Sequence, residues 1–226
     1  GQKEAMRNIK YKITRSNSLR EEGKTDESTK ILQEAHALHQ DARKTYPDWD
    51  KDVFDLNNMK EYAKGENSVV YEHPLNTGKL VKIMNKSEAE LNETMGNLKI
   101  GPNVVISPRK DSNGMYNVIM DKIKGDTLEN LWPKMEFEAK KNAALQIKAI
   151  IEKAGKEGYK LTDNNAANFI LNNGKSTRID FDNAHVKKIE QGGEEKAVKE
   201  ALAEAKSMFD LEDIDDDIWK YLPKES

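Results

Sequence analysis

This chain of 226 residues contains no cysteine, which excludes disulfide bonds, thiol catalysis and cysteine-ligated zinc. Aromatic residues make up only 7% of the chain, whereas 34% of its residues are charged. The 37 basic and 40 acidic residues nearly cancel, so the net charge of −3 creates no field that would attract nucleic acid. No apolar run is long enough to span a membrane, and no signal-peptide pattern is present. The mean hydropathy of −0.87 describes a soluble, heavily charged protein, and the absence of cysteine is compatible with a reducing cytosol.

Residues 1–50 predict a helical hairpin. Two helical segments, over residues 5–19 and 26–46, are separated by a charged segment around Gly23. The second segment has apolar residues at helical spacing, namely Ile31, Leu32, Ala35, Leu38 and Ala42. We expect this stripe to pack on the rest of the chain or on a partner protein, and we favour the chain itself because a long exposed stripe promotes aggregation. His36 and His39 could bind a metal from one helix face, but a polar face is the simpler interpretation.

Three oxygen-bearing side chains near the C-terminal end carry the clearest chemical signal. Asp163 precedes Asn168 by five residues, and Asp180 opens a second acidic cluster, Asp-Phe-Asp. Between them, an apolar run at residues 169–171 is followed by Asn-Asn-Gly at residues 172–174, a turn signal that leads to a second short segment at residues 177–179. This pattern predicts a β-hairpin, so that the three side chains would lie on loops beside strands. Mg²⁺ prefers oxygen ligands and usually keeps substrate phosphates in its remaining positions. Asn168 and Asp180 suit that task, and Asp163 could instead accept the proton of a substrate hydroxyl.

A lysine within an apolar strand is the second signal. Lys82 lies between Val81 and Ile83, and successive side chains of a strand point to opposite faces. Burial of an ammonium group without an anion is costly. We therefore expect Lys82 to face an anionic ligand or a carboxylate.

A helix predicted over residues 87–98 could supply that carboxylate. Ser87 is its expected N-cap and Glu90 the N3 residue of a capping box. Its buried stripe should consist of Leu91, Met95 and Leu98. Glu88, Glu90 and Glu93 all lie near this stripe, and we favour Glu90 as the partner of Lys82.

The order of these residues resembles the protein-kinase-like superfamily. Asp163 and Asn168 match the Asp and Asn of the catalytic loop H-R-D-x-x-x-x-N, and Asp180 matches the metal-binding Asp of D-F-G. Lys82 resembles the strand lysine that contacts ATP phosphates and pairs with a helix glutamate. The resemblance implies ATP and Mg²⁺ as cofactors, with Asp163 and Lys82 as catalytic residues and Asn168 and Asp180 as metal ligands.

The chain departs from the family pattern in both motifs. Leu161 and Thr162 replace the His-Arg pair, and Asp182 replaces the Gly of D-F-G. In many kinases that arginine pairs with a phosphorylated activation segment, so activation by this route is not expected here.

The segment at residues 116–128 is similar to the hinge between two kinase lobes. In this comparison Met120 is the gatekeeper residue, and the backbone groups of Asp121 and Ile123 receive the adenine. Residues 63–71 match the position of the Gly-rich loop. Here Gly65 stands for its second glycine, Ser68 for the third, and Val70 for the apolar residue that covers the adenine.

The resemblance implies an α+β, two-lobed protein-kinase-like fold. Residues 1–50 would form the helical extension, residues 51–122 the N-lobe and residues 123–226 a reduced C-lobe of the kinase-like domain 51–226. Few residues follow the metal loop, and no Ala-Pro-Glu ends an activation segment. A predicted alanine-rich helix at residues 194–209 could replace part of the missing C-lobe. The chain is most similar in this respect to the minimal kinases of secreted bacterial effectors.

The function implied is that of an ATP- and Mg²⁺-dependent protein Ser/Thr kinase acting on a host protein. Such a protein would be cytoplasmic, or would reach the host cytosol without a cleaved signal peptide, and it could require an activating partner. Asn165 occupies the position where Ser/Thr kinases usually carry lysine, so the acceptor class stays open. Three alternatives remain: a small-molecule kinase resembling the aminoglycoside phosphotransferases, a pseudokinase that serves as a binding module, and a transferase of AMP.

Overall fold

The structure is a computed structural model that describes residues 1–46, 59–65, 68–73, 78–110 and 113–209. The described residues form six α-helices and antiparallel sheets, an α+β arrangement compatible with the expected two-lobed fold. Two compact units are distinguished, and each is described by itself. Unit 1 comprises Gly1–Ala89 and Val104–Lys122, and unit 2 comprises Glu90–Asn103 and Ile123–Ser226.

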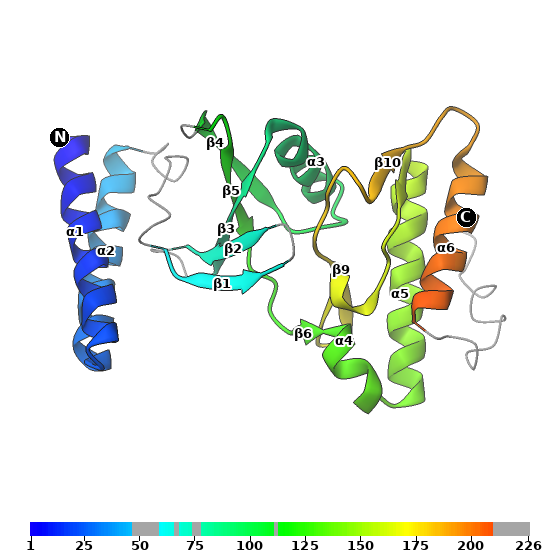
Figure 1. Ribbon diagram of the computed structural model, residues 1–226, viewed down its shortest axis with the longest axis horizontal. Helices are drawn as coiled ribbons and strands as arrows, with labels where there is room; N and C mark the ends of the chain where they lie inside the picture. The colour runs from blue at the N-terminus through cyan, green and yellow to red at the C-terminus, as the bar shows by residue number, and fades with distance from the viewer. Residues whose placement is uncertain (47–58, 66–67, 74–77, 111–112, 210–226) are drawn as a thin grey trace. The chain divides into compact units, whose positions relative to one another are not determined.

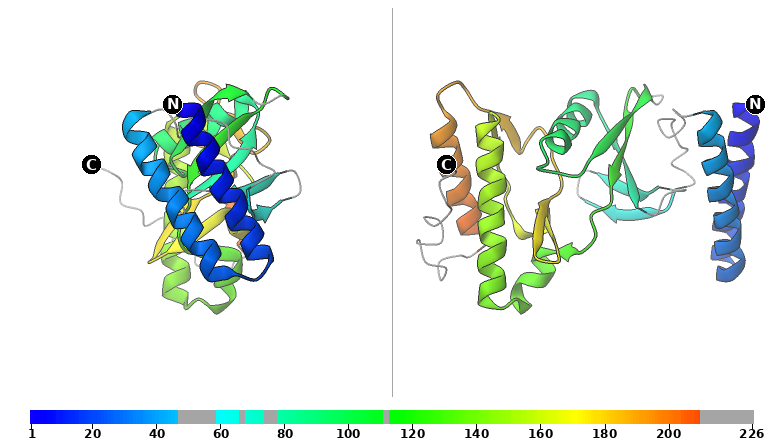
Figure 2. Two further views of the ribbon diagram at one scale, coloured as in Figure 1. Left: turned by 90° about the vertical axis from the view of Figure 1, so that its left-hand side faces the viewer. Right: turned by 180° about the vertical axis from the view of Figure 1, so that it is seen from behind.

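The predicted helical hairpin is confirmed. Helices α1 (Gln2–Glu21) and α2 (Thr25–Thr45) lie side by side in all three ribbon views (Figures 1 and 2). The turn between them contains Gly23 at φ 77, and the N–H of Lys24 donates to the carbonyl of Leu19 over 2.8 Å. The buried seam of the hairpin consists of Ile9, Ile13, Ala35 and Ala42. The boundary predicted near residue 50 lies outside the described residues.

Two details of the predicted second helix were wrong. Leu38 is 39% exposed, whereas His39 is 3% exposed and therefore does not belong to a polar face. The buried face of α2 includes Ser28, Ala35 and Ala42 at intervals of seven residues, so that His39 turns into the seam and Leu38 turns out of it.

Unit 1 contains a five-stranded antiparallel sheet in the order β1-β2-β3-β5-β4. The strands are β1 (Glu61–Lys64), β2 (Val69–Glu72), β3 (Lys79–Met84), β4 (Val104–Lys110) and β5 (Tyr116–Asp121). Val81 and Ile119 pack with Met59 on one face of this sheet, and Met84 and Val118 pack on the other. The strand around Lys82 and the strand before the expected hinge are both present as predicted.

Helix α3 (Lys86–Asn97) begins one residue before the predicted N-cap. Asn85 caps it, because its Oδ1 accepts the N–H of Glu88 over 2.9 Å. The capping box proposed for Ser87 and Glu90 was therefore wrong, since both residues lie within the helix. Met95 of the predicted stripe is fully buried, and Leu91 and Leu98 pack beside it.

Unit 2 combines helices with two small sheets. After β6 (Asp126–Thr127) the chain forms α4 (Leu128–Leu131), η3 (Trp132–Lys134), α5 (Phe137–Lys156), β7 (Tyr159–Leu161), η4 (Ala166–Asn168), β8 (Phe169–Asn172), β9 (Lys175–Arg178), β10 (Val186–Lys188) and α6 (Glu194–Met208). Strands β6, β8 and β9 form one sheet, and β7 pairs with β10.

The predicted alanine-rich helix is confirmed as α6, which lies beside α5 (Figures 1 and 2). Gly155 of α5 permits this approach, because a Cβ at that position would overlap Val198. The core between them and the small sheet includes Ile147, Ile151, Phe169, Ala201 and Ala205.

The predicted β-hairpin is also confirmed. Asn172 pairs with Lys175, and the two turn residues, Asn173 and Gly174, have φ values of 49 and 76. Asn-Gly is the preferred sequence for this two-residue turn because both positions need positive φ.

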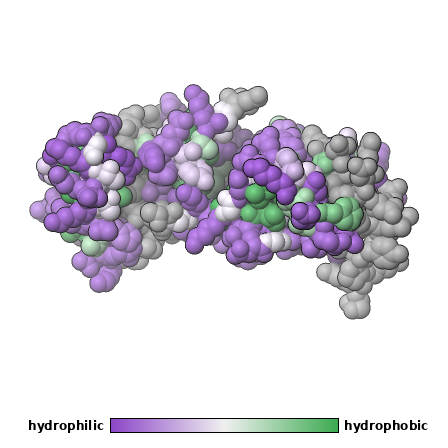
Figure 3. Space-filling view, turned by 90° about the horizontal axis from the view of Figure 1, so that it is seen from below, coloured by the Kyte–Doolittle hydropathy of each residue, from purple (hydrophilic) through white to green (hydrophobic). Residues whose placement is uncertain are grey.

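The surface is largely polar on the face shown in Figure 3. No helix among the described residues is long and apolar enough to cross a membrane.

Candidate active site

The predicted catalytic loop follows β7. Val186 of β10 pairs with Leu161, and the N–H of Thr162 donates to the carbonyl of His185 over 2.8 Å, which anchors the start of the loop. Asp163 and Asp180 have φ values of 55 and 65, respectively. Few residues other than glycine adopt this left-handed conformation, and such strain is concentrated at functional sites. Both acids that the sequence singled out are therefore held in an unusual backbone conformation.

Two amides hold the carboxylate of Asp163. Nδ2 of Asn168 donates to Oδ2 of Asp163 over 3.1 Å and to its carbonyl over 2.7 Å. Nδ2 of Asn165 donates to Oδ1 of Asp163 over 2.8 Å, while Oδ1 of Asn165 accepts the N–H of Ala167. The carboxylate is thus oriented by hydrogen bonds from two neutral amides.

Asn168 and Asp180 lie at the same end of the β8–β9 hairpin. Phe169 pairs with Arg178, and the carbonyl of Asn168 accepts the N–H of Ile179 over 2.8 Å, one residue before Asp180. The bonds to Asp163 use the amide nitrogen of Asn168, so its Oδ1 is the atom that could face a cation. One amide oxygen and one exposed carboxylate fit Mg²⁺ in chemistry, provided that phosphates and water complete its coordination.

Arg178 is the main residue that sequence reasoning missed. Its side chain is fully buried. Nη1 donates to Oδ1 of Asn164, and Nη2 donates to the carbonyl of Thr162 over 2.9 Å. The guanidinium carbon lies 5.8 Å from the ring centre of Phe169 and 5.5 Å from that of Phe181. These are distances at which a cation is attracted to an aromatic ring.

Burial lowers the pKa of Arg178 to about 10, and the carboxylates of Asp163, Asp180, Glu204 and Asp182 oppose this decrease. The guanidinium group therefore stays charged at neutral pH. It neutralises part of the negative charge that these acids concentrate around the loop.

A signal for Arg178 was present in the sequence. It lies between Thr177 and Ile179 in a short strand, where a cation is costly to bury without partners. The cost of burying a charge, which singled out Lys82, also singles out Arg178.

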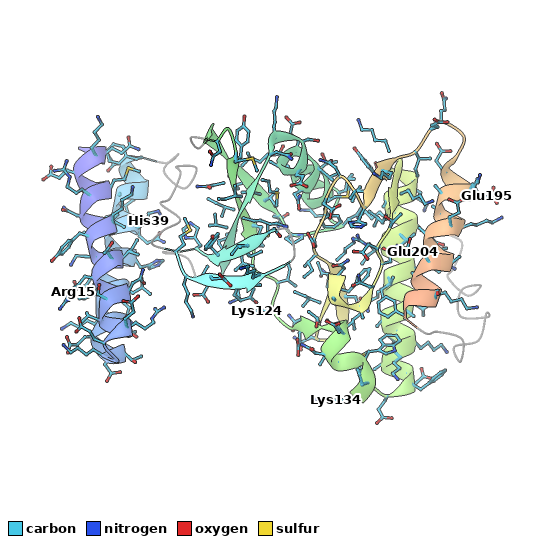
Figure 4. The ribbon with its side chains drawn as sticks, in the orientation of Figure 1. Arg15, His39, Lys124, Lys134, Glu195 and Glu204 are labelled. Carbon is cyan, nitrogen blue, oxygen red and sulfur yellow. The ribbon has the colours of Figure 1, made fainter. Side chains whose placement is uncertain are left out.

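Helix α6 also reaches the catalytic loop. Glu204, labelled on α6 in Figure 4, accepts the N–H of Asn164 at Oε1 over 3.0 Å. Nδ2 of the same asparagine, which is fully buried, donates to the carbonyl of Leu161 over 2.9 Å. Asn164 therefore connects α6, β7 and Arg178 within one hydrogen-bonded group.

Asp182, the acid that replaces the family's glycine, closes a turn with His185. Its Oδ1 accepts the backbone N–H of His185 over 2.8 Å, and its Oδ2 lies 2.9 Å from Nδ1 of the imidazole. Burial alone would raise the pKa of Asp182, but the hydrogen bonds from His185 outweigh it and lower the pKa. The same hydrogen bond to Asp182 raises the pKa of His185.

Phe181 fixes the backbone between the two acids of the metal loop. Nδ2 of Asn92, on α3, donates to the Phe181 carbonyl over 2.8 Å. The ring covers Gly101, where any side chain would collide with it. It is buried in a cluster with Met95, Ile100, Ala154, Leu161 and Val186.

Three of the expected nucleotide-binding residues of unit 1 share one sheet face. Val70 pairs with Lys82, Lys82 pairs with Val118, and Leu80 pairs with Met120. Because alternate strand residues face the same side, Val70, Lys82 and Met120 lie on that face together. Lys82 is partly buried there. Asp121, at the end of β5, forms an ion pair with Lys79 on the neighbouring strand.

The loop between β1 and β2 closes through a hydrogen bond from the N–H of Gly65 to the carbonyl of Ser68, over 2.8 Å. A Cβ at Gly65 would lie 3.7 Å from the Ser68 carbonyl oxygen, an ordinary contact, so the fold itself does not demand glycine. Of the glutamates on α3, Glu88 is partly buried, whereas Glu90 and Glu93 are exposed.

The structure thus assembles two sets of the expected residues. Asp163, Asn168 and Asp180 form one set in unit 2, where the expected adenine-binding residue Ile123 also lies. The sheet residues form the other set in unit 1. No family model matches this chain, and no curated protein matches it significantly.

Proposed function

We propose that this protein is an ATP- and Mg²⁺-dependent phosphotransferase with a protein-kinase-like fold. The observation that carries the proposal is the arrangement at the end of the β8–β9 hairpin. There Asn168 orients Asp163 through its amide nitrogen and lies beside Asp180. An oriented carboxylate next to a pair of oxygen ligands is what phosphoryl transfer to a hydroxyl requires.

In this proposal Asp163 aligns the acceptor hydroxyl and takes its proton. The amides of Asn165 and Asn168 hold the carboxylate still, so that alignment is established before the reaction. Such a base typically contributes a factor of about 10² to 10⁴ in rate.

Oδ1 of Asn168 and the carboxylate of Asp180 would hold Mg²⁺. Held by these two residues, Mg²⁺ would supply positive charge against the negative charge that develops on the phosphate oxygens. Asp180 is exposed, two residues after the end of β9, and could bind such an ion without burying its own charge.

The sheet face of unit 1 would bind the nucleotide. Lys82 would contact the phosphates, with Glu90 of α3 as its proposed partner, and Gly65 and Ser68 would cover the phosphates. Val70 and Met120 would line the adenine, and backbone groups of Asp121 and Ile123 would bind its edge. The sheet face that Val70, Lys82 and Met120 share supports this assignment. Val70 lies directly opposite Lys82 on the neighbouring strand, and Met120 is paired with Leu80, two residues before the lysine.

For the acceptor we propose Ser or Thr of a host protein, as in the secreted effector kinases that the sequence resembles. The protein would then act in the host cytosol. An activating partner would be required only if the purified chain proves inactive.

A small-molecule kinase is the second candidate, and the segment after the metal loop favours it. Asp182 closes its turn at His185, β10 follows at once, and α6 begins at Glu194. Residues 183–193 are few for an activation segment on which a protein substrate could dock. A screen of ATP consumption against sugars, choline-like alcohols and proteins separates the two candidates, and intact mass distinguishes phosphate from AMP by the size of the adduct.

The decisive experiment is incubation of the full chain with γ-labelled ATP, Mg²⁺ and a host-cell lysate. The wild type should transfer label, and Asp180→Ala should not. Asp41→Ala is the matched control, because Asp41 is 75% exposed and pairs only at the surface with Lys44, an interaction of little energetic weight. An MgATP-dependent rise in melting temperature that survives Asp180→Ala would contradict the metal assignment.

A further inference from the structure

We propose that Arg178, together with Glu204 of α6, positions the catalytic loop. In this proposal the guanidinium fork holds the two residues on either side of Asp163 and so sets the direction of its carboxylate. The inference rests on the proposed function, because it assigns a role to these residues within that same site.

The contacts place Arg178 on both flanks of Asp163. Nη2 donates to the carbonyl of Thr162 over 2.9 Å, and Nη1 donates to Oδ1 of Asn164. The residue between these two anchors is Asp163. Its backbone φ of 55 is unfavourable for most residues other than glycine. Strained backbone of this kind persists only where surrounding contacts hold it. Arg178, at the end of β9, supplies two of those contacts.

The surroundings of Arg178 leave it little freedom. The side chain is fully buried, and its guanidinium group lies near the rings of Phe169 and Phe181. Nε is buried without a hydrogen-bond partner among the described residues, so the two Nη groups alone make the directional contacts. A planar fork held in this way can fix two acceptors at once, which an ammonium group cannot do with the same geometry.

Glu204 holds the same loop through the backbone of Asn164, whereas Arg178 bonds to the side chain of that residue. Its Oε1 accepts the backbone N–H of Asn164, while the side-chain oxygen of that asparagine accepts from Arg178. Glu204 therefore connects α6 to the residue next to Asp163. A carboxylate with this contact is a positioning group, since the acceptor hydroxyl would be bound by Asp163 and not by Glu204.

The test compares wild type, Arg178→Lys, Glu204→Ala and Glu200→Ala in the full chain, with MgATP binding measured by calorimetry and ATP turnover measured at steady state. Arg178→Lys retains the charge but cannot span both acceptors. We expect kcat to fall by about 10²-fold, as for a small misplacement of a catalytic group. The KM for ATP should change by less than about threefold, because the lost interaction acts only in the reaction step.

Glu204→Ala should lower kcat by about tenfold, again with KM nearly unchanged. Glu200→Ala is its matched control, since Glu200 lies one turn earlier on α6, pairs with Lys160 and is 48% exposed. The control should behave as wild type in both measurements.

A folded Arg178→Lys variant with wild-type kcat overturns the proposal. This holds even if the variant has a lower melting temperature, because Arg178 would then contribute to stability alone. If Arg178→Lys does not fold, the comparison of Glu204→Ala with Glu200→Ala decides, and equal kcat values overturn the proposal. A wild-type chain that neither binds nor turns over MgATP refutes the proposed function itself, and this inference with it.

Discussion

Substitution of Gly101 by alanine tests how the metal loop is held. A Cβ at this position would lie 2.9 Å from Cζ of Phe181 and closer still to Cε2. Phe181 cannot swing away freely, since its side chain is 2% exposed and packs among Met95, Ile100 and Leu161. The backbone on one side of the contact must therefore move.

The magnitude follows from two opposing effects. Overpacking of a buried site costs about 1–3 kcal/mol. Replacing glycine by alanine restricts the unfolded chain and returns about 0.4–1 kcal/mol. We expect Gly101→Ala to lose about 1–2 kcal/mol of unfolding free energy, which lowers the melting temperature by about 2–8 °C in a chain of this size.

Thermal unfolding followed by circular dichroism measures this change. Gly65→Ala is the matched control for stability, because its Cβ would make only ordinary contacts. A double-mutant cycle with Phe181→Leu should return part of the loss, since the smaller side chain relieves the collision. A Gly101→Ala protein as stable as wild type would refute the packing of Phe181 on this glycine.

Three further predictions concern the site directly. Asp163→Asn should lower phosphoryl transfer by about 10² to 10⁴-fold while MgATP still binds, and unchanged turnover would remove Asp163 from the mechanism. Gly65→Ala should leave the melting temperature unchanged but weaken ATP binding in calorimetry if phosphates approach this backbone closely, and equal affinity would exclude that approach. The pair between Asp182 and His185 raises the pKa of the imidazole and lowers the pKa of the carboxylate. It therefore stabilises the fold between these two pKa values, and the stabilisation is lost as pH rises through the raised pKa of His185 or falls through the lowered pKa of Asp182. Asp182→Asn should therefore lower the pKa of His185 in an NMR titration, and an unshifted pKa would show that the pair does not form.

Local patterns predicted the elements that carry the site. Asn173 and Gly174 predicted their turn because both positions need a backbone conformation that few residues adopt readily. The strand around Lys82 was predicted because apolar residues lie on both sides of the lysine in the sequence. Patterns were less reliable at element ends, where Asn85 and not Ser87 caps α3. Two polar residues that lie two positions apart can both serve as caps, and only the packing of the helix selects between them.

The helical hairpin shows the same limit. The apolar spacing of α2 predicted a buried stripe, but it assigned Leu38 to that stripe and left His39 outside. A helix of 3.6 residues per turn has several nearly equivalent faces. Which one is covered depends on where α1 lies against it.

By itself the sequence determined the helical hairpin, the strands and the three oxygen-bearing residues Asp163, Asn168 and Asp180, because each is written in a short stretch of neighbouring residues. Only the tertiary structure decided that the buried Arg178 side chain bonds to the catalytic loop and that Glu204 of α6 bonds to the same loop. Asn164 and Glu204 are separated by 40 positions along the chain. Whether a charge is buried or exposed, and which partner satisfies it, depends on such distant neighbours, and local patterns do not record them.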